Sequence, residues 1–66
     1  MPNYRDECVE FDCELVNETE RSWIVEIDGM EYPVPKSLSV WTPAHYEAID
    51  GIIELPQWKA EELGIA

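Results

Sequence analysis

The sequence predicts a mainly β fold: about five short antiparallel strands in a bent sheet or a small SH3-like barrel, with one short C-terminal helix. Residues 9–15 alternate strictly between apolar and acidic side chains, which is the pattern of a half-buried strand. Two Asp-Gly pairs, each a strong turn signal, lie between apolar runs. The 66 residues allow a single domain, residues 1–66, and a sheet this short must curl to cover its core.

The first strand is predicted at residues 8–16, after a loose lead-in at residues 1–5. Its alternation places four apolar side chains on one face, where we expect them to form the core: Val9, Phe11, Cys13 and Leu15. The opposite face carries three carboxylates: Glu10, Asp12 and Glu14. The polar residues 17–20 are expected to form the turn that follows.

A hairpin is predicted next. Residues 22–27 are rich in aromatic and β-branched side chains, three of which share one face: Trp23, Val25 and Ile27. Asp28-Gly29 predicts a type I′ turn into a third strand at residues 30–34, whose inward side chains are Met30, Tyr32 and Val34. Pro33 and Pro35 lack the N–H that a central strand needs, so this strand should lie at an edge or break there.

The next segment alternates less regularly. Residues 38–41 are predicted as a fourth strand and residues 52–55 as the last one. Thr42-Pro43 is typical of a helix start and predicts a single helical turn in residues 42–47, with a hairpin arm at residues 46–49 as the alternative. Asp50-Gly51 predicts a turn before the last strand.

A short helix is predicted at residues 56–63. Pro56 suits its first turn and Gly64 suits its end, while Trp58 and Leu63 are the expected anchors to the sheet. A helix of about two turns is unstable alone, so packing must hold it.

The charge is unusual for so short a chain. Fifteen acidic residues against four basic ones give a formal net charge of −11. Residues 1–31 hold ten of the acids and two of the basic residues, so the negative charge is concentrated in the first half. Direct nucleic-acid binding is disfavoured because phosphate neutralisation needs clustered Lys and Arg. The expected partner is instead a protein with a basic surface.

The two cysteines predict neither a disulfide nor a metal site. Five positions along a strand separate Cys8 from Cys13 by roughly 17 Å, beyond the Cα separation of about 7 Å that a disulfide tolerates. Together with His45 they supply at most three soft ligands, in a spacing that fits no zinc site. We therefore expect both cysteines to be free thiols, which suits a protein located in the reducing cytoplasm. We also expect no cofactor. The sequence shows neither a secretory signal nor an apolar run of about 20 residues, so no membrane association is expected.

The second half of the chain carries a recognisable pattern. It contains Val34-Pro35-Lys36-Ser37, then Ile53-Glu54-Leu55-Pro56-Gln57-Trp58-Lys59-Ala60, then Leu63-Gly64-Ile65. This resembles small uncharacterised proteins of bacteriophages and prophages, which carry an aliphatic-Pro-Lys-Ser segment and a C-terminal aliphatic-Pro-x-Trp-x-Ala-x-x-x-Gly helix. Lys59 stands where Leu is common in them. The resemblance implies a phage-associated origin, hence a bacterial host cell, and no catalytic residues.

The acidic side chains of the first two strands form the candidate site. Alternate residues of a strand lie about 6.7 Å apart, and matching parity on the second strand can place further acids beside the first set. The predicted partner-binding face consists of Glu10, Asp12, Glu14, Glu26 and Asp28. We expect it to mimic a nucleic acid and to inhibit a bacterial defence or nucleic-acid-processing complex. The alternative is that these acids only solvate the outer face of the sheet.

No catalytic constellation is apparent, so the chain is predicted not to be an enzyme. His45 is expected to be a loop or cap residue, and no nucleophile stands in a supporting order with it. Ile24 and Ile52 have outward parity and form a possible apolar surface. A small structural or assembly module that joins a larger particle or dimerises weakly through that surface is therefore the alternative function.

Overall fold

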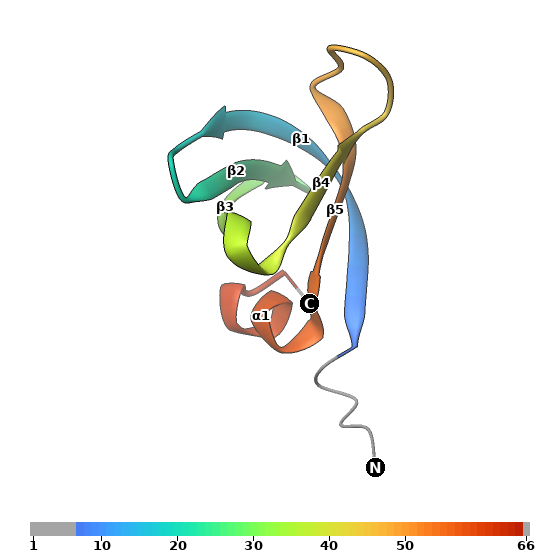
Figure 1. The fold of residues 1–66 in the computed structure, drawn as a ribbon. Coiled ribbons are helices and arrows are strands. Elements are labelled where there is room, and N and C mark those ends of the chain that lie inside the picture. The colour runs from blue at the N-terminus through green and yellow to red at the C-terminus, as the bar shows by residue number, and fades with distance from the viewer. Residues whose placement is uncertain (1–6, 66) are drawn as a thin grey trace.

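The computed structural model of the chain describes residues 7–65, which form one five-stranded antiparallel sheet and a short helix (Figure 1). The strands lie in the order β3-β2-β1-β5-β4. Of the two predicted forms, the bent sheet is the one observed, and it does not close into a barrel. The predicted lead-in at residues 1–5 lies outside the described residues. The elements are β1 (Cys8–Glu18), β2 (Ser22–Ile27), β3 (Met30–Pro35), the 3₁₀ helix η2 (Lys36–Leu38), β4 (Val40–Pro43), β5 (Asp50–Pro56) and α1 (Gln57–Leu63).

Strand β1 is shared between two parts of the sheet. Its C-terminal half pairs with β2 and its N-terminal half pairs with β5, and Glu14 has an opposed residue on both sides. The register to β2 shifts between Leu15 and Asn17, which leaves Val16 as the extra residue of a β-bulge. A bulge bends its strand, and β1 is accordingly the long curved strand that runs beside both β2 and β5 (Figure 1).

The first strand is longer than predicted. Asn17 and Glu18 do not form the predicted turn: they pair with Ile24 and Trp23 and so extend β1. The turn is shorter, and the Thr19 hydroxyl oxygen stabilises it by accepting the N–H of Ser22 at 3.0 Å. The bulge makes this extension possible because it resets the register after Leu15.

The β2–β3 hairpin agrees with its prediction. Asp28 and Gly29 have φ values of 52° and 83°, as a type I′ turn requires. Strand β3 lies at the edge of the sheet, as its prolines indicated, and continues through Pro35. Met30 lies on the inward side, opposite Ile27, but it is 59% exposed because it belongs to the last pair before the turn, at the free end of the hairpin.

The segment after β3 differs most from its prediction. Residues 36–38 form η2, so the fourth strand begins two residues late, at Val40. The Ser39 hydroxyl donates to the Pro35 carbonyl at 2.6 Å and helps to stabilise this compact turn. No helical turn follows in residues 42–47. Residues 44–49 instead form the loop of the β4–β5 hairpin, closed by the Ala44 N–H donating to the Asp50 carbonyl at 2.8 Å.

The predicted turn at Asp50-Gly51 is also wrong. Both residues belong to β5, with Asp50 opposite Glu14 and Gly51 opposite Cys13. A β-carbon on Gly51 would lie 2.8 Å from both the Pro43 Cα and the Trp41 ring. Gly51 is therefore required for the close approach of β4, whereas Gly29 is required for a turn.

The core lies on the concave side of the sheet, under α1. Its completely buried members are Val25, Val34, Ile53, Leu55 and Ala60, and Cys13 is 7% exposed. The predicted apolar face of β1 packs here, since Val9, Phe11 and Leu15 contact this cluster. No helix in residues 7–65 is both long and apolar enough to span a membrane.

Helix α1 begins at Gln57 and ends at Leu63, and Gly64 caps it with a φ of 87°, as predicted for the helix end. Ala60 is part of the core and Leu63 packs against it. Ile65, which follows the helix in the sequence, also packs against the core. Trp58 was expected to be an anchor, but it is only half-buried and is not part of the core. It lies two positions from Ala60, about 200° around the helix, and so faces away from the core.

Candidate functional site

The predicted acidic residues of β1 all lie on the outer, convex face of the sheet. Glu10, Asp12 and Glu14 are exposed, while Val9, Phe11 and Cys13 between them face the core. Opposed residues of an antiparallel pair point to the same face. The register therefore shows which residues of the neighbouring strands join these carboxylates.

Four carboxylates form a row that crosses four strands. Glu31 of β3 is opposite Glu26 of β2, Glu26 is opposite Glu14 of β1, and Glu14 is opposite Asp50 of β5. We call Glu31, Glu26, Glu14 and Asp50 the acidic row. Neighbouring strands are about 4.8 Å apart, so the acidic row concentrates four negative groups within roughly 15 Å.

A further pair of carboxylates lies nearer the start of β1. Glu10 is directly opposite Glu54 of β5, on the same outer face as the acidic row. Asp12, between Glu10 and Glu14, is opposite Ile52. The outer face of β1 and β5 thus carries five carboxylates around one isoleucine.

No cation compensates this charge in the part of the chain that the structure describes. Lys36 pairs with Glu18 and its Nζ lies 4.5 Å from the centre of the Trp23 ring. Lys59 pairs with Glu62 at 2.6 Å on the helix. Neither ion pair among residues 7–65 involves the acidic row, and Arg21 lies in the exposed turn between β1 and β2.

Four of the five residues of the predicted binding face share one face of the sheet. Glu10, Asp12, Glu14 and Glu26 lie on one face, but Asp28 is in the hairpin turn with a φ of 52°, beyond the end of β2. The left-handed conformation takes Asp28 out of the strand alternation, so it does not belong to the acidic row.

Three residues of this face were missed: Glu31, Asp50 and Glu54. A signal for Glu31 was present, because a two-residue turn at Asp28-Gly29 places residue 26 opposite residue 31. Asp50 and Glu54 depend on the pairing of β1 with β5, which are far apart in the sequence, and no local pattern indicates it.

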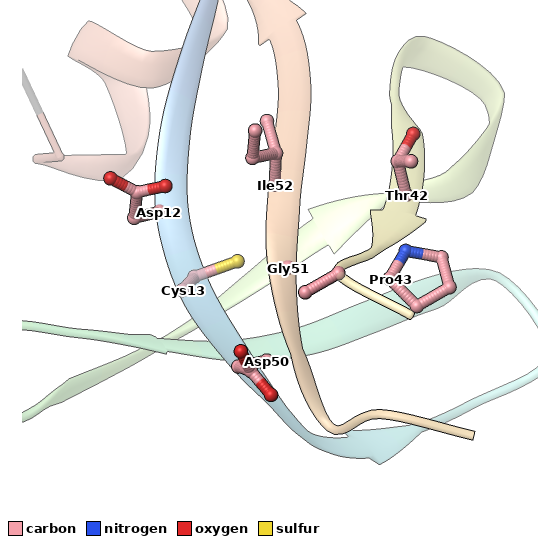
Figure 2. Close-up of a pocket in the computed structure, with 8 residues that line it drawn as sticks. Asp12, Cys13, Thr42, Pro43, Asp50, Gly51 and Ile52 are labelled. Carbon is pink, nitrogen blue, oxygen red and sulfur yellow. The ribbon is translucent and has the colours of Figure 1, made fainter. Parts of the chain in front are cut away.

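A shallow groove lies between the acidic residues and β4. Its volume is about 500 Å³, and Figure 2 shows Asp12, Asp50 and Ile52 on the β1 and β5 side and Thr42 and Pro43 on the β4 side. Gly51 forms part of its floor, since the ring of Trp41 packs against it from below. Two carboxylates beside an exposed isoleucine suit a long side chain that ends in a cation.

The cysteines do not contribute a reactive group to this groove. Both are free, Cys8 exposed and Cys13 buried, as expected. The pKa of the Cys13 thiol is raised to about 11, chiefly by burial; a hydrogen bond with the Ile53 backbone lowers it and the neighbouring Asp12 carboxylate adds a smaller increase. Cys13 is therefore a neutral core residue at neutral pH.

The remaining candidates are dispersed. His45 is exposed in the β4–β5 loop, with its Nδ1 3.3 Å from the Tyr46 carbonyl oxygen. Residues 7–65 contain no group of three or more His, Cys, Asp or Glu side chains arranged to hold a metal ion.

The predicted apolar surface is divided. Ile24 is half-buried on β2 between Asn17 and Pro33, whereas Ile52 is 39% exposed on β5 between Asp12 and Thr42. They do not meet, because β1 separates them. Ile52 has a different apolar neighbour, Val40 of β4, which is 57% exposed.

In comparisons with known proteins, no family model, no curated protein and no solved structure matches this chain.

Proposed function

We propose that this chain is a non-enzymatic binding protein whose acidic outer face engages a basic, nucleic-acid-binding surface of a protein partner. The acidic row is the observation that carries the proposal. Like charges directly opposite one another across strands are destabilising, and here three successive pairs repeat that arrangement. A face that served only solubility would gain as much from interspersed charges of both signs.

The proposed action is competition with nucleic acid. A regular array of fixed negative charges resembles a phosphate backbone in the property that non-specific nucleic-acid sites recognise. The net charge of −11 also favours rapid encounter with a basic partner, by long-range attraction that salt screens. The resemblance of the second half to phage proteins makes bacterial defence proteins that bind nucleic acid the first partners to test.

The test compares the native protein with two triple variants in affinity capture from a bacterial lysate. One variant, the row variant, removes three of the four charges of the acidic row by Glu14→Gln, Glu26→Gln and Asp50→Asn. The other removes as many charges elsewhere, by Glu7→Gln, Glu20→Gln and Glu61→Gln, at exposed positions outside the row. Captured proteins are identified by mass spectrometry and then tested for DNA or RNA binding in the presence of the protein.

The expected result is a nucleic-acid-binding protein captured by the native chain and the control variant but lost with the row variant. Binding should weaken steeply between about 0.05 M and about 0.5 M salt, because the Debye length falls from more than 10 Å to less than 5 Å. Equal capture by all three proteins, or a partner that still binds nucleic acid when saturated, would contradict the proposal.

A second candidate, the assembly module, is favoured by one observation. Val40 and Ile52 are exposed apolar residues on neighbouring strands, in diagonal positions of the register. If they join the protein to itself or to a larger particle, the native protein should form a concentration-dependent oligomer in analytical ultracentrifugation. Ile52→Glu should then abolish that oligomer, whereas Ile24→Glu should not.

A further inference from the structure

We propose that the N-terminal half of β1 is a docking edge, at which an extended basic segment of the partner adds to the sheet as an antiparallel strand. This inference rests on the proposed function and specifies its binding mode. Residues 8–13 of β1 pair with β5 on one side only, because the pairing with β2 starts at Glu14. In the described chain no strand pairs with their other side.

The register identifies the backbone groups that this edge presents. The Leu15 N–H donates to the Ile49 carbonyl at 2.6 Å, on the β5 side. Backbone groups alternate in direction along a strand, so the odd residues from Val9 to Leu15 direct theirs to β5. The N–H and C=O groups of Cys8, Glu10 and Asp12 consequently point to the open side.

The other two edges of the sheet present far fewer donors. On β3, Met30 directs its backbone N–H and C=O groups to Ile27 of β2, so residues 31, 33 and 35 direct their backbone groups away from the sheet. Two of these three residues are proline and have no N–H. On β4 the outward residues are Trp41 and Pro43, so only one N–H remains. Prolines protect exposed edges from pairing. Among the sheet edges of residues 7–65, the edge of β1 lacks this protection.

The side chains at this edge define the occupant. Glu10 and Asp12 are exposed on the outer face, whereas Val9 and Phe11 are half-buried on the core face. In an added antiparallel strand, residues opposite Glu10 and Asp12 meet carboxylates and should be Lys or Arg. Residues opposite Val9 and Phe11 extend the core face and should be apolar, so the recognised segment alternates basic and apolar residues.

A second copy of this chain is a poor occupant by comparison. Antiparallel pairing of two such edges brings the carboxylates of Glu10 and Asp12 from both chains together, and each chain carries a net charge of −11. A basic segment is favoured by the same charges. A hollow of about 190 Å³ over β1 and β5 is lined by Glu10, Phe11, Asp12 and Ile52, and the aliphatic part of a Lys or Arg side chain that extends across β1 can lie in it.

The test uses synthetic peptides long enough to cover residues 8–13, with binding followed by fluorescence anisotropy. One peptide alternates lysine and valine, and its control has the same composition with the lysines first and the valines last. Two further peptides carry N-methyl groups, either on the lysine amides, which would face β1, or on the valine amides, which would face solvent.

The alternating peptide should bind at least about tenfold more tightly than the block peptide, the factor that corresponds to one or two net hydrogen bonds. Methylation of the lysine amides should remove this advantage, and methylation of the valine amides should not. Hydrogen exchange of the Glu10 and Asp12 amides should slow when the alternating peptide binds, while the Phe11 amide, already bonded to β5, should change little.

A protein variant provides an independent readout. Glu10→Pro removes the outward N–H without removing a bond to β5, and Glu10→Gln removes the same charge but keeps the N–H. Only the proline variant should bind the alternating and block peptides equally, provided that circular dichroism shows an unchanged fold.

The outcomes separate this inference from the proposed function. Equal binding of all four peptides, still dependent on the acidic row, would overturn edge pairing and leave the acidic face as a binding surface. Binding of none would overturn edge pairing, and the affinity capture described above would then decide the proposed function alone. A dimer of the native protein that Glu10→Pro dissociates would overturn the basic occupant in favour of a second copy.

Discussion

At the scale of single residues, a few side chains decide how closely the two parts of the sheet approach. Gly51 is the clearest case, because the space that a β-carbon would occupy is already filled by the backbone of β4 and the Trp41 ring. Gly29 differs, since no atom lies within 4 Å of its missing β-carbon and only its positive φ of 83° favours glycine. Two glycines are therefore needed for two different physical reasons.

Gly51→Ala should destabilise the protein by about 1–3 kcal/mol, the usual cost of overpacking a site that cannot expand. Gly29→Ala is the matched control and should cost only about 1 kcal/mol, from the left-handed conformation alone. Urea denaturation followed by tryptophan fluorescence measures both. An equal loss of stability in the two variants would show that β4 moves aside without cost.

Cys13 links stability to alkaline pH. Its pKa rises on folding from 9.0 to about 11, so between these values the unfolded chain releases a proton that the folded chain retains. The free energy of unfolding should therefore fall as pH rises through this window, and this part of the stability is fully present below pH 9. The free energy of unfolding, obtained from denaturation curves, should depend on pH differently in the native protein and in Cys13→Ala only between pH 9 and about pH 11. The native thiol of Cys13 should also resist alkylation under conditions that modify Cys8.

At the scale of elements, β1 determines both the shape of the sheet and its charge. One strand joins the β2–β3 hairpin to β5 and β4, and the bulge at Val16 lets it follow both. Its outer residue Glu14 consequently lies inside the acidic row, with an acidic neighbour on each side.

Glu26→Gln should stabilise the protein by roughly 0.2–1 kcal/mol, because Glu26 opposes acids on both neighbouring strands. Glu14→Gln should do the same, and the double variant should gain less than the sum, since the first change already relieves the shared repulsion. Glu20→Gln, at an exposed turn position, is the control and should have little effect. A loss of stability in Glu26→Gln would show that the row is not repulsive.

At the scale of the whole molecule, negative charge opposes compaction. The chain has a net charge of −11 on 66 residues, and its negative side chains repel one another more strongly in the folded state than in the expanded chain. No ion pair of residues 7–65 reduces the repulsion within the acidic row.

Raising the salt concentration from about 0.01 M to about 0.5 M should therefore raise the midpoint of thermal unfolding, because screening shortens the Debye length from about 30 Å to less than 5 Å. The rise should be smaller in the row variant, which lacks three of the four charges of the acidic row. A midpoint that falls with salt would indicate that ion pairs dominate over this repulsion.

The alternation of β1, the boundaries of β2, the type I′ turn and the position of the helix followed from local patterns. Each depends on residues within a few positions, such as Asp28 and Gly29 in the turn or Gly64 at the helix end. The segment from Lys36 to Gly51 was predicted less well. There the 3₁₀ helix, the loop and the start of β5 depend on the Ser39–Pro35 hydrogen bond and on β4 packing against Gly51, contacts that local propensity does not encode.

The sequence by itself therefore determined a mainly β chain with a strand that is apolar on one face and acidic on the other. Its period of two requires this division wherever the strand lies. Only the tertiary structure decided that Glu31, Glu26, Glu14 and Asp50 form one row, and that the edge of residues 8–13 is open. The row depends on the pairing of β1 with β5 across most of the chain, and the open edge depends on β2 pairing with β1 only from Glu14 onward. Pairing between distant segments leaves no trace in a local pattern.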